Sequence, residues 1–202
     1  MQRLLTEILD LIFPPSEDEI ILREAAKQSV AKLYQPGKIE RTQYISEYSQ
    51  TVTRIAITEN KFHNNHLASR ILGQLIDEWA NKQTGPTIFI PIPLGKKRLR
   101  ERGHNQVETV LKAAYTKLDI RNDILMRSVE TLPQSHLNKT KRQQNMKNVF
   151  SLSKKELFLE PGTQIVLVDD VITTGATMNA ARATLAPHLP PNTTLTCLAI
   201  AH

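Results

Sequence analysis

IVLVDDVITTGAT, residues 165–177, is the stretch of this sequence that decides the fold. Its first four residues are β-favouring and apolar, which is typical of a strand buried on both faces of a parallel sheet. We predict that this strand ends in two carboxylates, Asp169 and Asp170, and that a helix beginning near Thr177 follows through Leu185. Ligands of open α/β sheets bind outside the carboxyl ends of the strands, which is where the connecting loop would lie.

The loop between this strand and this helix has the composition of a phosphate site. The start of a helix presents free backbone N–H groups and a positive dipole end, and both favour a phosphate. Two carboxylates beside a phosphate would repel it, so Asp169 and Asp170 are expected to hold sugar hydroxyls or a divalent cation instead. The alternative is an ordinary buried strand followed by a polar loop and a Thr-capped helix.

The rest of the chain alternates between strand and helix patterns. We predict strands within 40–50, at 87–92, weakly at 124–127, and at 195–200, and helices at 51–58, 66–80 and 105–115. Alternating strands and helices favour an α/β fold with a doubly wound, mostly parallel sheet. We assign residues 41–202 to this domain.

Residues 1–40 are predicted to form a separate helical hairpin. The first helix should stop at Pro14 and Pro15. Ser16 and Glu19 have the spacing of a capping box, which would open a second helix reaching about Leu33. We assign this hairpin no chemistry beyond packing.

Composition narrows the class of protein. The chain has 202 residues, a formal net charge of +6 and one cysteine, Cys197. A single cysteine excludes internal disulfides and a multi-cysteine zinc site, so we expect no zinc and a reducing, cytoplasmic setting. No apolar stretch approaches the ~18 residues of a membrane span, and we expect no membrane partner.

A basic segment leaves the predicted strand at 87–92. Its glycine and cations suit a loop that closes on a pyrophosphate, with backbone amides and side chains offsetting charge. The residues we assign to this pyrophosphate loop are Leu94, Gly95, Lys96, Lys97, Arg100 and Arg102. The alternatives are a solvated helix face or a nucleic-acid patch, with single-stranded DNA as a possible partner. Aromatic residues that would stack on bases are missing near this cluster in the sequence, which favours the small polyphosphate.

The stretch 165–177 resembles the phosphoribosyl-pyrophosphate (PRPP) motif of type I phosphoribosyltransferases. The resemblance implies that the two acids hold the ribose hydroxyls, directly or through Mg²⁺ bound with PRPP, and that the following loop wraps the 5-phosphate. The PRPP-binding residues would be Asp169, Asp170, Val171, Thr173, Thr174, Gly175, Ala176 and Thr177.

A second set of residues narrows the resemblance to the ComF (GntX-like) family. These residues are Ile92-Pro-Leu, then Arg100, Arg102, Gly103, Asn105 and Gln106, and the run Arg127, Thr131, Gln134, Leu137, Arg142, Asn145 and Phe150. The similarity covers about 44–202 and implies a type I phosphoribosyltransferase fold with a flexible hood. The chain departs from the ComF pattern at two places. ComF relatives commonly begin with a cysteine-rich zinc-binding segment, which a chain with one cysteine cannot build. Family members also usually have Phe at the position where this chain has His104.

The polar segment 128–150 would be that hood, and the alternative is a mobile surface loop. Gln134, Arg142 and Asn145 are its candidate contacts to pyrophosphate or to the incoming group. A dimer is a further expectation from the resemblance.

The resemblance implies Mg²⁺-dependent transfer of phosphoribosyl from PRPP to an unidentified acceptor, with release of pyrophosphate. Asp169, Asp170 and Arg102 would be the catalytic residues. Relatives acting on 6-oxopurines place an acid where this chain has Thr173, which argues against hypoxanthine or guanine as the acceptor. The alternative function is a non-catalytic PRPP- or nucleotide-binding protein, or a DNA-uptake (competence) factor, on the same fold.

Overall fold

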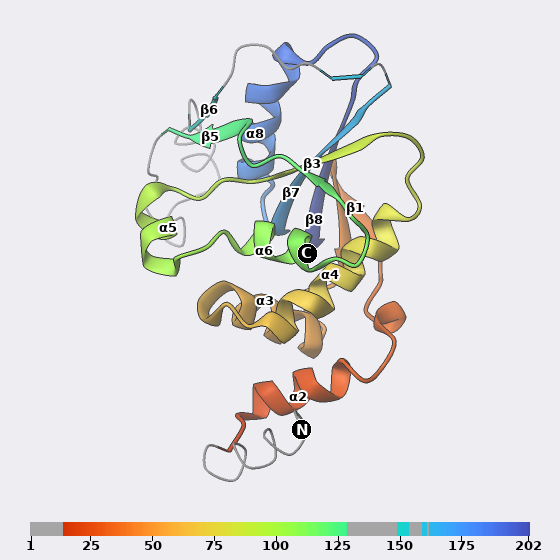
Figure 1. Cartoon of the computed structure of the whole chain (residues 1–202), viewed down its shortest axis with the longest axis vertical. Helices are drawn as coiled ribbons and strands as arrows, with labels where there is room; N and C mark the ends of the chain where they lie inside the picture. Colours follow the sequence, from red (N-terminus) through yellow and green to blue (C-terminus); the bar gives the residue numbers. More distant parts are fainter. Residues whose placement is uncertain (1–13, 129–148, 154–158, 161) are drawn as a thin grey trace.

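The central sheet is built around the strand that carries the two acids. The computed structural model describes residues 14–128, 149–153, 159–160 and 162–202, which are coloured in Figure 1. Within these residues the sheet has the order β1-β2-β8-β7-β3-β4. The strands are β1 (Gly37–Ile39), β2 (Thr42–Ser46), β3 (Thr87–Pro91), β4 (Asp119–Ile120), β7 (Gln164–Val171) and β8 (Thr194–Ala201). All neighbours pair in parallel except β1 and β2, so the predicted α/β class and mostly parallel sheet are confirmed.

Helices cover both faces of this sheet, as Figure 1 shows. Val166 and Val168 of β7 pack in one core with α3 (Thr51–His63), α4 (His66–Ala80) and α6 (Gln106–Ala113). Ile165 and Leu167 point the other way, into a second core with α8 (Ala176–Leu185). All four β7 side chains are fully buried. Burial on both faces explains why this strand is continuously apolar rather than alternating.

The sheet changes direction between β3 and β7. From β3 the chain passes through α6 to β4 on one side, and from β7 it passes through α8 to β8 on the other. Right-handed crossovers in opposite directions place their helices on opposite faces, and ligands of such sheets bind in the crevice outside the carboxyl ends of the two inner strands. The segments after β3 and β7 are the two that the sequence marks as ligand loops.

The N-terminal region matches its prediction in part. Ser16 is confirmed as the N-cap, because its Oγ accepts a hydrogen bond from Glu19 N, and α2 (Glu17–Ala25) begins there. The Glu19 side chain accepts a hydrogen bond from Arg23, so only the Ser16 half of the predicted capping box is seen. The predicted extension to Leu33 is wrong: α2 ends at Ala25, and a separate 3₁₀ turn, η1 (Val30–Lys32), is capped by the Ser29 side chain. A polar residue that bonds the backbone locally competes with continued helix. The predicted first helix lies outside the described residues.

The basic segment after β3 is a short helix, α5 (Lys96–Arg102), and not the open loop that we predicted. Arg, Lys, Leu and Glu are all good helix formers, and Gly103 ends the helix in the left-handed conformation with φ of 75°. A two-stranded antiparallel sheet, β5 (Leu125–Arg127) and β6 (Phe150–Leu152), stands beside α8. A 3₁₀ turn, η3 (Ala186–His188), follows α8. None of the described helices is long and apolar enough to cross a membrane.

Candidate functional site

Asp170 is held rigidly at the end of β7. Its Oδ1 accepts the backbone N–H of Val171 at 2.8 Å, and its Oδ2 accepts Gln106 Nε2 at 3.1 Å. Lys61 Nζ, from the last turn of α3, lies 3.5 Å from the same Oδ2. The side chain is almost fully buried. Hydrogen bonds to both oxygens and an ion pair together compensate a carboxylate at this depth.

The negative charge of Asp169 has fewer hydrogen-bond and ion-pair partners among the described residues than that of Asp170. Its Oδ1 accepts the backbone N–H of Asp170 at 2.9 Å, and its side chain is half-buried. Burial, and then the neighbouring charge of Asp170, raise the pKa of Asp169 to about 8, against the weaker attraction of Lys61. Burial and a neighbouring negative charge both disfavour the ionised carboxyl, whereas a cation or a hydroxyl donor beside it would favour that form. Asp169 is therefore the acid of the pair whose ionised form a cation or hydroxyl ligand would stabilise more.

The segment Arg102–Gln106 ties the end of β3 to these acids. Asn105 caps α6 through its Oδ1, and its Nδ2 donates to the carbonyl of Ile92 at 3.0 Å. Gln106 then lies where its amide can donate to Asp170 and accept Arg102 Nη1 at 2.9 Å. The Arg-Gly-x-Asn-Gln spacing thus has a physical reason, because a helix end, a left-handed glycine and a new helix cap place one glutamine between a cation and an acid.

His104, at the centre of this segment, joins it to α3. Its Nδ1 lies 2.9 Å from the carbonyl oxygen of Arg102, and its Nε2 lies 2.8 Å from that of Asn60. Asn60 is buried and donates its Nδ2 to the carbonyl of Gln106 at 2.9 Å. These bonds fix the end of α3, and with it Lys61, against the start of α6.

Cations surround the acids from three separate elements. Burial is the main cause that lowers the pKa of Arg102, opposed by the attraction of Asp170. Burial also lowers the pKa of Arg127 on β5, where Arg98 lowers it further and Asp169 raises it. Arg98 thus acts on both guanidinium groups. The site presents crowded positive charge, and such crowding is relieved by an anionic ligand.

The predicted phosphate loop follows directly. α8 begins at Ala176, one residue before the predicted start, and its N-cap is Gly175 at φ of 67°. The cap residue supplies no side-chain hydrogen bond, so the first N–H groups of α8 are not covered by a cap. Thr173 is exposed and Thr174 is half-buried. This loop keeps the donors that a phosphate needs.

The structure brings together some of the predicted site residues and separates others. Arg102 reaches the acids through Gln106, whereas Lys96, Lys97 and Arg100 are exposed on α5. The hood candidates Gln134, Arg142 and Asn145 lie outside the described residues. Sequence reasoning missed Lys61, because nothing in the pattern of α3 marks one lysine as the partner of an acid more than 100 residues away.

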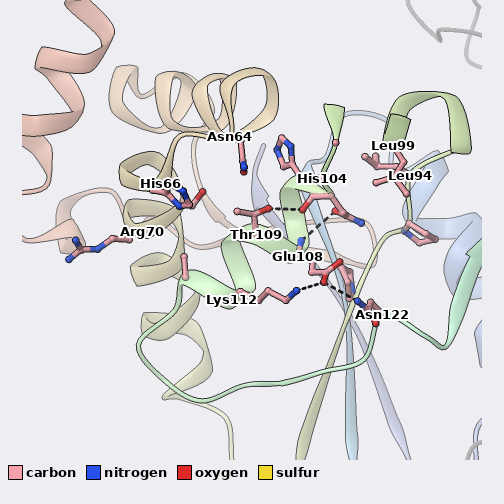
Figure 2. Close-up of a pocket in the computed structure, with 16 residues that line it drawn as sticks. Asn64, His66, Arg70, Leu94, Leu99, His104, Glu108, Thr109, Lys112 and Asn122 are labelled. Carbon is pink, nitrogen blue, oxygen red and sulfur yellow. Dashed lines mark hydrogen bonds and ion pairs between the residues drawn. The ribbon is translucent and has the colours of Figure 1, made fainter. Parts of the chain in front are cut away.

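A cavity of about 840 Å³ is lined by the 103–105 turn and by parts of α4 and α6 (Figure 2). Its lining includes His66, Leu94, Leu99, His104 and Glu108, but neither Asp169 nor Asp170. Glu108 accepts Asn122 Nδ2 at 2.9 Å and pairs with Lys112 at 2.5 Å, as the dashed lines in Figure 2 show. Glu108 is therefore already paired with a cation, and the two acids at the end of β7 lie outside the lining of this cavity.

Comparison with known proteins finds relatives that are named as competence proteins or as DNA utilization proteins. The chain is 38% identical over 135 residues to Competence protein F of Haemophilus influenzae, covering 62% of this chain and 58% of the relative. It is 30% identical over 154 residues to DNA utilization protein YhgH of Salmonella typhi, covering 72% and 66%. It is 29% identical over 126 residues to Competence protein ComFC of Streptococcus pneumoniae, covering 62% and 53%. The matched part is less than two thirds of each relative's length, and no family model matches the chain.

Proposed function

Because the chain belongs to the ComF-like family, we propose that its crevice binds PRPP and transfers the phosphoribosyl group to a nucleophile, releasing pyrophosphate. One observation carries the proposal. Two adjacent acids stand at the switch point of a mostly parallel sheet, a loop with open helix N–H groups follows them, and the cations of α5 follow the neighbouring strand β3. The helix N–H groups would suit the 5-phosphate, the two acids would suit the ribose diol, and the cations would suit the pyrophosphate.

The ribose of PRPP would lie over the two acids. Asp169 has the poorly compensated carboxyl, so it would accept hydrogen bonds from the ribose hydroxyls, while Asp170 stays fixed by Gln106 and Lys61. The 5-phosphate would then reach residues 173–177 and the first N–H groups of α8. This orientation leaves the anomeric carbon and its pyrophosphate directed to the neighbouring strand, β3, and to the segment that follows it.

The reaction breaks the bond between the anomeric carbon and the pyrophosphate oxygen and forms a bond from that carbon to the nucleophile, which loses a proton. Positive charge grows on the sugar ring and negative charge on the leaving group. Asp169 and Asp170 would stabilise the ring, and Arg102 with Arg98 would stabilise the pyrophosphate, because fixed charges act strongly in a partly buried site. Arg102 is held in place by Gln106.

Magnesium fits this donor set as a partner of PRPP. Mg²⁺ is typically held by one or two carboxylates together with substrate phosphates, and Asp169 and Asp170 supply such carboxylates. Burial and the charge of Asp170 raise the pKa of Asp169, and a bound cation would favour its ionised form. When bound, Mg²⁺ would offset charge on the pyrophosphate.

Pyrophosphate release tests the transfer step. The protein is incubated with PRPP and Mg²⁺ and a panel of purines, pyrimidines and amines, with Asp169→Asn as the matched inactive variant. Release that depends on one acceptor and falls at least about 100-fold in the variant supports a transferase. PRPP binding without acceptor-dependent release from any member of the panel would favour a binding protein.

A role in DNA uptake or use is a second candidate function. It is favoured by the names of the relatives and by the exposed cations of α5. We propose single-stranded DNA as the ligand. Binding that weakens steeply with salt, and that weakens again in Arg98→Gln/Arg100→Gln, would support this role. Salt-independent binding, or none, would count against it.

A further inference from the structure

An exposed aromatic ring stands at the mouth of the carboxylate site. Phe62, in the last turn of α3, is 63% exposed and is not part of the hydrophobic core. The guanidinium carbon of Arg102 lies 5.6 Å from the centre of its ring, and Lys61 Nζ lies 6.0 Å from it. Both cations also belong to the network around Asp170. This ring is the aromatic neighbour that the basic cluster lacks in the sequence.

The helix next to this ring buries none of its side chains. α5 carries Lys96, Lys97, Arg98, Arg100 and Arg102, with Glu101 as its one acid, and every residue except Arg102 is exposed. A helix without buried side chains gains little stability from packing, so packing does not account for its sequence. A surface function such as ligand binding would account for it. Its concentration of positive charge matches a polyanion.

We propose that Phe62 is a stacking platform for a base of single-stranded DNA, and that the basic surface of α5 takes the phosphates on either side of that base. Exposed aromatic rings next to a cationic track are how proteins hold single strands without reading sequence. We favour a single strand over a duplex, because each base of a duplex is stacked between neighbouring base pairs and its face is covered. The bases of a single strand can expose a face, which can then stack on the Phe62 ring, 63% of whose residue surface is exposed. The platform deepens the second proposed function and rests on it.

The position of the ring links the two proposed ligands. Phe62 directly follows Lys61, which pairs with Asp170, and it contacts Arg102, which is bonded to Gln106. A base stacked there would lie beside the cations assigned to pyrophosphate. DNA bound at the platform should therefore compete with PRPP for positive charge, so that each weakens the binding of the other.

Fluorescence anisotropy with a labelled 12-nucleotide oligo(dT) strand tests the platform in the full chain. Phe62→Ala should weaken binding about tenfold or more, while Phe62→Trp should keep or strengthen it. Phe62→Leu, which keeps an apolar side chain without a ring, should behave like alanine. Arg98→Gln should lower the slope of log affinity against log salt by about 0.7.

Tyr115 provides the matched control. It is 67% exposed and hydrogen-bonded to Arg70, so it is also an exposed ring beside a cation, but it follows the other end of α6. Tyr115→Ala should leave oligo(dT) binding unchanged. An equal loss in Tyr115→Ala and Phe62→Ala would overturn the platform, and so would wild-type affinity in Phe62→Ala.

A calorimetric titration of Phe62→Ala with PRPP and Mg²⁺ distinguishes a failure of the platform proposal from a failure of the PRPP proposal. Retained PRPP binding with lost oligo(dT) binding supports a stacking role for the Phe62 ring that PRPP binding does not require. No oligo(dT) binding by the wild type would overturn the platform and the DNA role together, while leaving the PRPP proposal standing. A duplex of the same length that binds as tightly as the single strand would show that phosphates alone are recognised, and would also overturn the platform.

Discussion

Replacing Asp169 with asparagine should make the protein more stable near pH 8 when neither PRPP nor a divalent cation is added. Burial and the charge of Asp170 raise the pKa of Asp169 from 3.8 to about 8. Between these values the folded chain holds a proton that the unfolded chain has released, so stability falls as pH rises through this window. Asparagine cannot ionise, and its Oδ1 can still accept the Asp170 N–H bond seen at 2.9 Å. The free energy of unfolding of the variant should therefore not fall through this pH window.

The size of the effect follows from the shift. Each pKa unit corresponds to about 1.4 kcal/mol, so a fully buried group with this shift would lose on the order of 5 kcal/mol. Asp169 is only half-buried, and solvent screens its charge, so about 2–3 kcal/mol is the expected difference. The difference between the two proteins should be absent below about pH 3.8, the unfolded pKa, and should grow progressively up to about pH 8.

Urea denaturation at several pH values, with a chelator present and no PRPP, measures this difference. Asp170→Asn is the matched control, because its carboxylate is already bonded by Gln106 and paired with Lys61. That variant should lose stability, by about 1 kcal/mol. An Asp169→Asn variant that is no more stable than wild type at pH 8, or whose advantage does not grow with pH, would refute the idea that Asp169 is kept undercompensated for a ligand.

Three further perturbations have defined outcomes. Gln106→Leu removes the link between Asp170 and Arg102, so it should lower the free energy of unfolding by about 1–3 kcal/mol and PRPP affinity by at least about tenfold; unchanged affinity would show that Gln106 does not position the site. Gly73→Ala should destabilise by about 1–3 kcal/mol in thermal melts, because its Cβ would lie 2.8 Å from the backbone at Ala113; an unchanged melting temperature would mean that α4 and α6 can move apart. Cys197 is 1% exposed and burial raises the pKa of its thiol, so a thiol reagent should label it only after denaturation; rapid labelling of the native chain would contradict the buried strand.

The parts of the fold that sequence reasoning predicts well are those with strong periodicity and clear ends. The helix at 66–80 is found with these bounds, because its apolar residues recur on one face and Asn65 caps its start. The strand predicted at 165–168 extends to Val171, through both acids. Its continued pairing with β8 at Asp169 and Val171 explains the extension, since backbone pairing does not depend on an apolar side chain.

The parts that it misses depend on contacts between distant segments. The basic segment 96–102 carries loop-like glycines at both ends, and they turn out to be the caps of a helix. Phe62 and Arg102 are 40 residues apart in the sequence, so no local pattern could show that the basic cluster has an aromatic neighbour. β6 is three residues long and gains its order by pairing with β5, which local propensity does not report.

Calorimetric titration with PRPP and Mg²⁺ tests the central claim most directly. The wild-type chain should bind PRPP with about one site, and Asp169→Asn/Asp170→Asn should bind at least about 100-fold more weakly while remaining folded by circular dichroism. Binding should also fail for ribose 5-phosphate at the same concentration, because it lacks the pyrophosphate that Arg102 and Arg98 would hold. No heat of binding in the wild type, or equal binding by the double variant, would contradict the assignment of this crevice to PRPP.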